Sequence, residues 1–334
     1  MNDLKPILLK LASGSSLKEK EAQLAFDIVM SGGATPSQIG ALCMGMRVRG
    51  ETVDEIAGAA KSMREKALKM EAPEGSVDTA GTGGDGMGTY NVSTAAAIVA
   101  AACGVPVAKH GNKAISSKTG SADVLSALGV NIDAPMELIR ESLWSHNIGF
   151  FMAPRHHGAM KYVGPVRKKI GKRTIFNMIG PLSSPALVKN QVVGVFDEKL
   201  LEIFANALKD LKIDFAWIVN SEDGLDEISP YAKTNVVQLK NNNITQIVIN
   251  PKELNIKPNS FENLLGKNPE YNSQKILEIF KGEDNDFSLA VCLNAAAGLI
   301  VCNKHENFED AYEECRKHIL SGKTFNYLKL IQNG

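Results

Sequence analysis

The amino-acid sequence predicts an α/β protein in two parts, a small N-terminal helical bundle and a larger, mostly parallel sheet covered by helices. Two patterns support this: repeated helix-start signals come first, and alternating strand-like and helix-like segments follow. The chain has 334 residues, 44% of them hydrophobic, which suits one large or two modest domains. We therefore expect a helical domain at residues 1–72 and an α/β domain at residues 73–334.

The helical domain is predicted from three capping boxes. In each box a hydroxyl accepts a hydrogen bond from an N–H group of the first helical turn. The side chain of a Glu or Gln three residues later accepts one from the backbone N–H of the hydroxyl residue. These boxes begin at Ser16, Thr35 and Thr52, and Gly50 fits the end of the second helix.

Pro73-Glu74-Gly75 ends this pattern, and βα units follow. A basic segment of helical pattern, residues 160–179, interrupts the alternation. We expect it, with residues up to 185, to pack on the helical domain, and we expect a turn at residues 241–243. The strands are predicted at residues 76–80, 105–109, 148–152, 191–196, 215–219 and 246–249, and the helices of this part at 93–103, 120–128, 198–211 and 287–302.

Composition narrows the classes of function. Lys and Arg together number 37, as do Asp and Glu, so no overall attraction to nucleic acid or to an anionic membrane is expected. The apolar runs are too short to cross a bilayer, and no signal segment opens the chain. Five cysteines, an odd number without a CxxC pair, predict reduced thiols and a cytoplasmic protein.

A glycine-rich loop at residues 78–89 is the most distinctive motif. Five glycines within eight residues let backbone N–H groups approach a ligand, and the following helix start favours a phosphate. The loop also matches GxGxxG, but the next strand ends in Lys109-His110 and not in the acidic residue of a dinucleotide fold. A turn without a ligand is the alternative; Asn91, Ser93 and Thr94 at the helix start favour a ligand.

The second predicted strand leads into another donor-rich loop, residues 109–121. It holds three lysines, four hydroxyls and two glycines where ligands gather in an open α/β sheet. A solvated basic loop is the alternative for each lysine taken singly. For His110, a positioning or structural role is as well supported as acid–base chemistry.

Two further features complete the expected site. Asp226-Glu227 follows a turn at Gly224 beyond a predicted strand, and adjacent carboxylates suit Mg²⁺, which also keeps waters and phosphate oxygens. A surface acidic turn is the alternative for this pair taken alone; the two donor-rich loops at the same sheet edge favour the metal. Residues 161–173 hold six basic side chains, most of which are expected to form a solvated helix face, while one arginine among them could pair with a substrate carboxylate. Spacing does not choose which arginine.

Taken together, these motifs resemble the anthranilate phosphoribosyltransferases over essentially the full length, in the order and spacing of that family. The resemblance implies the fold of the nucleoside phosphorylase/phosphoribosyltransferase type. This sequence departs from the family pattern at His157-Gly158, where the family frequently has His-Pro, and at Ser183-Ser184-Pro185, where it usually has Thr-Asn-Pro. The matching stretches are residues 81–85, 91–94, 109–112, 120–123, 166–167, 173–177, 180–182 and 224–227.

The resemblance also implies a function, a cofactor and a homodimer. The expected reaction transfers the phosphoribosyl group of PRPP (5-phosphoribosyl 1-diphosphate) to the amine of anthranilate in tryptophan biosynthesis, with Mg²⁺ and without a covalent intermediate. The implied PRPP contacts are Gly81, Gly84, Asp85, Thr89, Asn91, Val92, Ser93, Thr94, Lys109, His110, Gly111, Asn112, Lys113, Ala114, Ile115, Ser116, Ser117 and Ser121. The implied anthranilate contacts are Gly81, Asn112 and Arg167, the metal ligands Ser93, Asp226 and Glu227, and the residues with catalytic roles Lys109, Asn112 and Arg167.

Three other functions compete with this expectation. A pyrimidine nucleoside phosphorylase shares the architecture but needs no acidic metal pair. A non-catalytic relative that binds nucleic acid is disfavoured by the zero net charge. A dinucleotide-dependent oxidoreductase is disfavoured by Lys109-His110.

Overall fold

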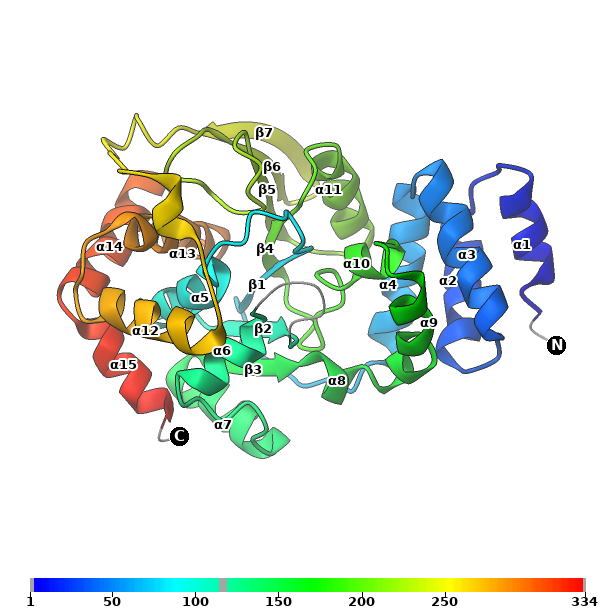
Figure 1. The fold of residues 1–334 in the computed structure, drawn as a ribbon, viewed down its shortest axis with the longest axis horizontal. Coiled ribbons are helices and arrows are strands. Elements are labelled where there is room, and N and C mark those ends of the chain that lie inside the picture. Colours follow the sequence, from blue (N-terminus) through cyan, green and yellow to red (C-terminus); the bar gives the residue numbers. More distant parts are fainter. Residues whose placement is uncertain (1–2, 114–118, 333–334) are drawn as a thin grey trace.

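The computed structural model describes residues 3–113 and 119–332, which form two units side by side (Figure 1). The helical unit holds the N-terminus, and the C-terminus lies on the far side of the sheet unit. The first helices are α1 (Lys5–Ala12), α2 (Glu19–Met30), α3 (Pro36–Arg49) and α4 (Val53–Lys66).

The predicted capping boxes at Thr35 and Thr52 are confirmed. The Thr35 hydroxyl accepts from the Gln38 N–H at 3.3 Å, and the Gln38 side chain accepts from the Thr35 N–H at 2.9 Å. Thr52 and Glu55 form the same reciprocal pair at the start of α4.

The predicted box at Ser16 is wrong, because α2 begins two residues later. Lys18 is its N-cap, and Glu21 accepts from the Lys18 N–H at 2.7 Å. The Leu17 N–H donates to the buried carboxylate of Glu55 at 2.9 Å. That tertiary contact holds the chain extended at Lys18, whose ψ is 158°, and so delays the helix.

A seven-stranded sheet forms the centre of the second unit, in the order β3-β2-β1-β4-β5-β6-β7. The strands from β3 to β5 are parallel, whereas β6 and β7 are antiparallel. The β6–β7 hairpin turns at Asn241 and Asn242, both with positive φ. The strands are β1 (Val77–Gly81), β2 (Val107–Gly111), β3 (Ile148–Met152), β4 (Asn190–Gly194), β5 (Phe215–Ser221), β6 (Thr234–Lys240) and β7 (Asn243–Ile249).

Helices cover both faces of the sheet. Along β5, successive side chains enter the two apolar cores on opposite faces. Phe215, Trp217 and Val219 enter the core formed with α5 and α13, whereas Ala216 and Ile218 enter the core shared with α4 and α11. The remaining helices are α5 (Val92–Ala102), α6 (Ser121–Ala127), α7 (Met136–His146), α8 (Ala153–His156), η1 (Gly158–Tyr162), α9 (Gly164–Ile170), α10 (Ile175–Ile179), α11 (Leu200–Asp210), η2 (Phe261–Leu264), α12 (Pro269–Phe280), α13 (Asp286–Val301), α14 (Phe308–Leu320) and α15 (Lys323–Gln332).

The basic segment after β3 returns to the helical unit. Helix α9 packs on α3, and α10 packs on α3 and α4, so that Val166 and Phe176 join the same apolar core as Phe26 of α2. The Phe26 and Phe176 rings lie 5.4 Å apart, centroid to centroid. The helical unit is therefore built from two separate stretches of chain.

Across residues 3–113 and 119–332, no helix is both long and apolar enough to cross a membrane.

Candidate active site

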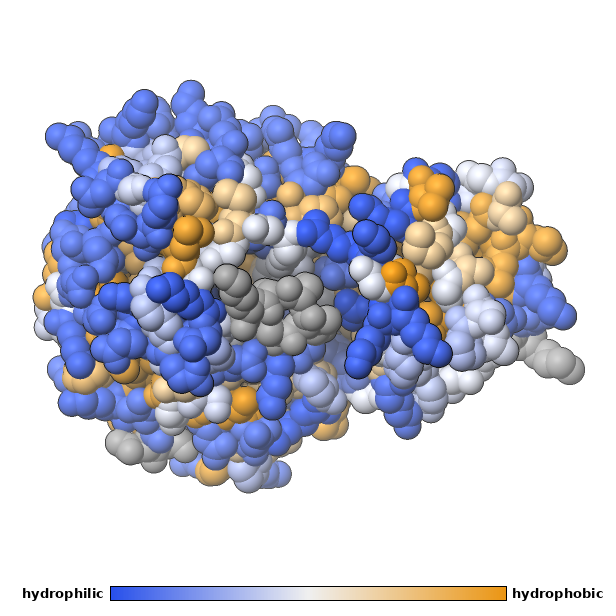
Figure 2. Space-filling model, viewed as in Figure 1, coloured by the Kyte–Doolittle hydropathy of each residue, from blue (hydrophilic) through white to orange (hydrophobic). Residues whose placement is uncertain are grey.

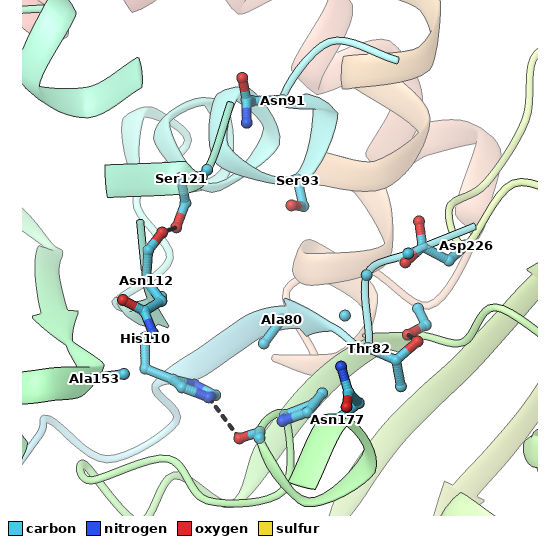
Figure 3. A pocket seen from close by; sticks show the side chains of 18 of the residues that line it. Ala80, Thr82, Asn91, Ser93, His110, Asn112, Ser121, Ala153, Asn177 and Asp226 are labelled. Carbon is cyan, nitrogen blue, oxygen red and sulfur yellow. Dashed lines mark hydrogen bonds between the residues drawn. The ribbon is translucent and has the colours of Figure 1, made fainter. Parts of the chain in front are cut away.

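A cavity of about 1020 Å³ lies at the carboxyl ends of β1, β2 and β4, where the two units meet. Ligands gather at this end of a parallel sheet. Asn91 and Ser93 reach it from the start of α5, and Asn112 from the chain after β2, while Asn177 approaches from α10 (Figure 3). Both units thus supply its wall. On the face shown in Figure 2, hydrophilic and hydrophobic side chains lie side by side where the two units meet.

The glycine-rich loop forms one side of the cavity, between β1 and α5. Gly83, Gly84, Gly86 and Gly88 have φ between 61° and 81°, a backbone region that side chains rarely adopt. A later segment anchors the loop: the Tyr90 N–H donates to the Leu264 carbonyl at 2.8 Å, and the Gly266 N–H donates to the Gly88 carbonyl at 2.8 Å. The loop is therefore shaped for a ligand that contacts its backbone.

Asp226 and Glu227 lie opposite the start of α5. One Glu227 oxygen accepts from the backbone N–H of Ser93 at 3.1 Å. At the strand ends, a Cβ on Gly81 would lie 3.3 Å from the Asp226 carboxylate, and one on Gly194 would overlap the Asp226 backbone. The neighbouring strands β1 and β4 thus both end in glycine where the chain at Asp226 passes close to them.

Electrostatics in this group favour a bound cation. Burial, and then the charge of Asp85, raise the pKa of Asp226 to about 7. Burial, followed by the charges of Asp226 and Asp85, raises the pKa of Glu227 well above its usual value. A divalent cation would relieve this repulsion, and the donors, carboxylates beside the Ser93 hydroxyl, are the hard oxygens that Mg²⁺ prefers. The residues therefore fit the predicted metal.

Lys109 lies at the end of β2 with its ammonium group held by Thr79 of β1. It donates to the Thr79 carbonyl and lies 3.4 Å from the Thr79 hydroxyl. Burial lowers the pKa of Lys109 to about 8, against the charges of Asp78 and Glu227, which raise it. The side chain thus remains a cation at neutral pH, oriented by strand β1 toward the cavity that it lines.

His110 is fixed through both ring nitrogens. Its Nδ1 contacts the carboxylate of Asp78, and its Nε2 lies 2.8 Å from the carbonyl oxygen of Gly180 (Figure 3). The backbone N–H of His110 also donates to Asp78, at 3.2 Å. These contacts leave no ring nitrogen for a substrate and favour a positioning role for the side chain.

Arg167 of α9 lines the cavity from the helical unit. Its guanidinium carbon lies 5.8 Å from the ring centroid of Phe176. Burial lowers the pKa of Arg167, with the nearby Cys43 thiol acting in the opposite direction. A half-buried arginine in a cavity wall is suited to pairing with a carboxylate.

Most of the predicted site residues meet at this cavity. Val92 and Thr94 are buried and do not line it. Ala114, Ile115, Ser116 and Ser117 lie outside the described residues. Those that line the cavity are Gly81, Gly84, Asp85, Thr89, Asn91, Ser93, Lys109, His110, Gly111, Asn112, Lys113, Ser121, Arg167, Asp226 and Glu227.

Other lining residues were not among the predicted contacts. Arg173 and Asn177 belong to a stretch that matched the family, which could have pointed to them. Lys267 and Asn272 come from a part of the sequence without any motif. Asn272 donates to the Asn91 side chain at 3.1 Å and accepts from the Lys267 N–H at 2.8 Å. These tertiary contacts, and no sequence motif, bring the two residues to the cavity wall.

The sequence of the chain is similar to that of known proteins. Residues 5–67 match the helical bundle domain of the glycosyl transferase family, and residues 74–325 match the a/b domain of that family. The chain is 59% identical to the anthranilate phosphoribosyltransferase of Pelagibacter ubique (strain HTCC1062), over 97% of this chain and 98% of that one.

Solved structures agree with this similarity. The anthranilate phosphoribosyltransferase of Thermus thermophilus has a TM-score of 0.91 and 37% sequence identity, with 98% of each chain covered. The enzyme of Saccharomyces cerevisiae, in complex with PRPP and Mg, has a TM-score of 0.90 and 26% identity, with 99% of this chain and 97% of that chain covered.

Proposed function

The chain belongs to the anthranilate phosphoribosyltransferase family, and from this premise we propose that its cavity joins the phosphoribosyl group of PRPP to anthranilate. The enzyme is a pentosyl transferase of tryptophan biosynthesis that forms N-(5-phosphoribosyl)anthranilate and pyrophosphate. One observation carries the assignment of the site: an acidic pair, a glycine loop and a buried lysine meet at one sheet edge.

The proposed reaction is a displacement at C1 of the ribose. The amine nitrogen of anthranilate forms a bond to C1, the bond from C1 to the diphosphate oxygen breaks, and the amine loses one proton. An aryl amine is largely unprotonated at neutral pH, so a strong base is not required. Orientation of the acceptor and stabilisation of the leaving pyrophosphate are the main tasks of the protein.

Residues of this chain divide these tasks. Lys109 would stabilise the charge that grows on pyrophosphate, together with N–H groups of the glycine loop. Asn112 and Arg167 would orient anthranilate, with Arg167 against its carboxylate. No serine or cysteine nucleophile is needed.

Mg²⁺ is the proposed cofactor, held by Asp226 and Glu227 with the Ser93 hydroxyl. When bound, it neutralises charge on the diphosphate. The support is the raised pKa values of both carboxyl groups and the presence of Mg with PRPP in the yeast relative. The predicted PRPP contacts that line the cavity, from the glycine loop, the start of α5 and the loop after β2, are also proposed, because the yeast relative is in complex with PRPP.

We further propose a cytoplasmic homodimer. All five cysteines are free thiols, which suits a reducing compartment. Leu9 of α1 and Val48 of α3 are 72% and 83% exposed, and these helices pack side by side at the end of the helical unit. Light scattering after size exclusion tests the dimer: Leu9→Asp with Val48→Asp should give a monomer, and an unchanged mass would place the interface elsewhere.

Anthranilate fluorescence provides the test of the reaction. The signal is followed after mixing the enzyme with PRPP, with and without Mg²⁺. Loss of fluorescence only when both are present supports the acceptor, the donor and the metal together. If a folded sample leaves the fluorescence unchanged, anthranilate is not the acceptor, and phosphorolysis of thymidine is the next assay.

A further inference from the structure

Arg173, in the short connection between α9 and α10, lies directly against the glycine loop. A Cβ placed on Gly84 would lie 2.8 Å from Nη2 of Arg173 and 3.1 Å from its Nε. The guanidinium carbon also lies 4.2 Å from the ring centroid of Phe196, just beyond β4. The guanidinium group is thus in contact with an aromatic ring and with a glycine at which a side chain would displace it.

The Arg173 side chain is half-buried and lines the cavity, yet within residues 3–113 and 119–332 it makes no hydrogen bond or ion pair. By contrast, Arg64 donates to the Leu182 carbonyl and Arg49 pairs with Glu55. A guanidinium has five N–H donors in a planar fork that matches two oxygens of a phosphate or carboxylate. An anchored guanidinium without a protein acceptor, facing a cavity, is suited to binding an anionic ligand.

The position of Arg173 indicates which anion. It contacts the loop whose backbone N–H groups and helix start favour a phosphate, and it lies beside Gly84, next in sequence to Asp85 of the acidic group. Arg167, in contrast, packs over the ring of Phe176 in α10. The two arginines therefore face different parts of the cavity.

We propose that Arg173 is a catalytic residue that binds the diphosphate of PRPP from the segment that packs on the helical unit, beside the N–H groups of the glycine loop. This inference rests on the proposed function. Since Arg173 follows α9, which packs on α3, and Gly84 belongs to the sheet unit, the diphosphate would bind to both units at once. Binding of PRPP would then hold the two units together across the cavity.

The test compares Arg173→Gln and Arg173→Lys with Lys172→Gln, which removes an exposed neighbouring charge. Arg173→Gln should raise the KM for PRPP by roughly 10- to 100-fold, as expected for loss of a charged hydrogen-bond donor. The KM for anthranilate should stay within about twofold, because its carboxylate is bound elsewhere. Arg173→Lys should recover only part of the loss, since lysine lacks the planar fork.

Phe196→Leu provides a second variant that keeps the charge and removes the aromatic support. It should raise the KM for PRPP in the same direction but by a smaller factor, roughly two- to fivefold. A merely structural role would instead lower the unfolding temperature and change both KM values alike. The proposal is overturned if Arg173→Gln, folded as the parent, leaves the PRPP KM unchanged or raises only that of anthranilate.

Calorimetric titration with magnesium pyrophosphate separates this inference from the proposed function. Weaker binding by Arg173→Gln than by the parent and by Lys172→Gln supports the role of Arg173, even if anthranilate proves not to be the acceptor. Equal binding by all three proteins overturns it, whatever the parent does in the fluorescence assay.

Discussion

The buried carboxylate of Asp78 on β1 contacts Nδ1 of His110 on β2, and the opposite ring nitrogen contacts the Gly180 carbonyl at 2.8 Å. Both partners are hydrogen-bond acceptors, so the ring satisfies both only when both its nitrogens carry protons. Burial lowers the pKa of His110, but the charge and hydrogen bond of Asp78 and the Gly180 carbonyl raise it further, and the result is a pKa above 6.5. The pair thus ties two strands to the turn after α10.

This pair predicts a pH-dependent stability. Because the pKa of folded His110 is raised, its contribution is fully present below about pH 6.5 and is lost as the pH rises through the folded value. Asp78→Asn should therefore cost about 3 kcal/mol of unfolding free energy at about pH 6, and less at about pH 9. Urea unfolding at both pH values measures this, and an equal cost at both would contradict it.

His156 provides a control, because its contribution to stability should depend on pH in the opposite direction from that of His110. It is buried, with Nδ1 2.6 Å from the Leu68 carbonyl, and burial lowers its pKa, to which the charges of Arg155 and His110 add. A lowered pKa means that stability is lost as the pH falls. The stability difference between the parent and His156→Gln should therefore shrink on acidification, whereas that of Asp78→Asn should grow.

Lys109 predicts a limit at alkaline pH. Its pKa, lowered by burial to about 8, means that the free enzyme loses this cation above that pH. The value of kcat/KM for PRPP should therefore fall above about pH 8, since this parameter reports groups of the free enzyme. Lys109→Arg keeps the charge, so any activity that it retains should lose this alkaline limb; if the limb stays in place, another group causes it.

The acidic pair predicts how activity depends on metal. Asp226→Asn and Glu227→Gln should each raise the Mg²⁺ concentration for half-maximal rate at least about tenfold, because each removes a carboxylate ligand. Glu222→Gln, an exposed acid on the same segment, serves as the matched control. If Asp226→Asn titrates with Mg²⁺ as the parent does, Asp226 is not a ligand.

Arg167 predicts a selective effect on the acceptor. Arg167→Ala should raise the KM for anthranilate by roughly 10- to 100-fold and leave the KM for PRPP within about twofold. Lys168→Ala, an exposed neighbour on the same helix, should change neither. An unchanged anthranilate KM in Arg167→Ala would remove its assigned role.

Local sequence signals predicted much of the fold where they acted alone. Thr35 and Thr52 start their helices as expected, because the box is formed within four residues. The strand predicted to begin at Val105 begins instead at Val107, after Pro106, which has no N–H for the ladder. Strand β6 was not predicted, although its pairing with β5 extends over seven residues, because its residues show no clear alternation.

The site residues that could be predicted are those in a recognisable local pattern, such as Gly84 in the glycine-rich loop and Asp226 in the acidic pair. The position of Asn272 was not predictable from local sequence, since it reaches the cavity only through its contact with Asn91, 181 residues earlier. The opposite holds for Thr94, which carries a suitable hydroxyl but lies on the face of α5 that enters the core. Which face a residue takes is decided by packing between distant segments.

The division of the helical unit into two stretches has a consequence during synthesis on the ribosome. Helices α3 and α4 are complete by residue 66, but their partners α9 and α10 begin only at Gly164 and Ile175. At a synthesis rate of about 5–20 residues per second, the apolar faces of α3 and α4 remain without those partners for roughly 5–20 seconds. Nascent chains of this length should thus be a preferred substrate for ribosome-associated chaperones.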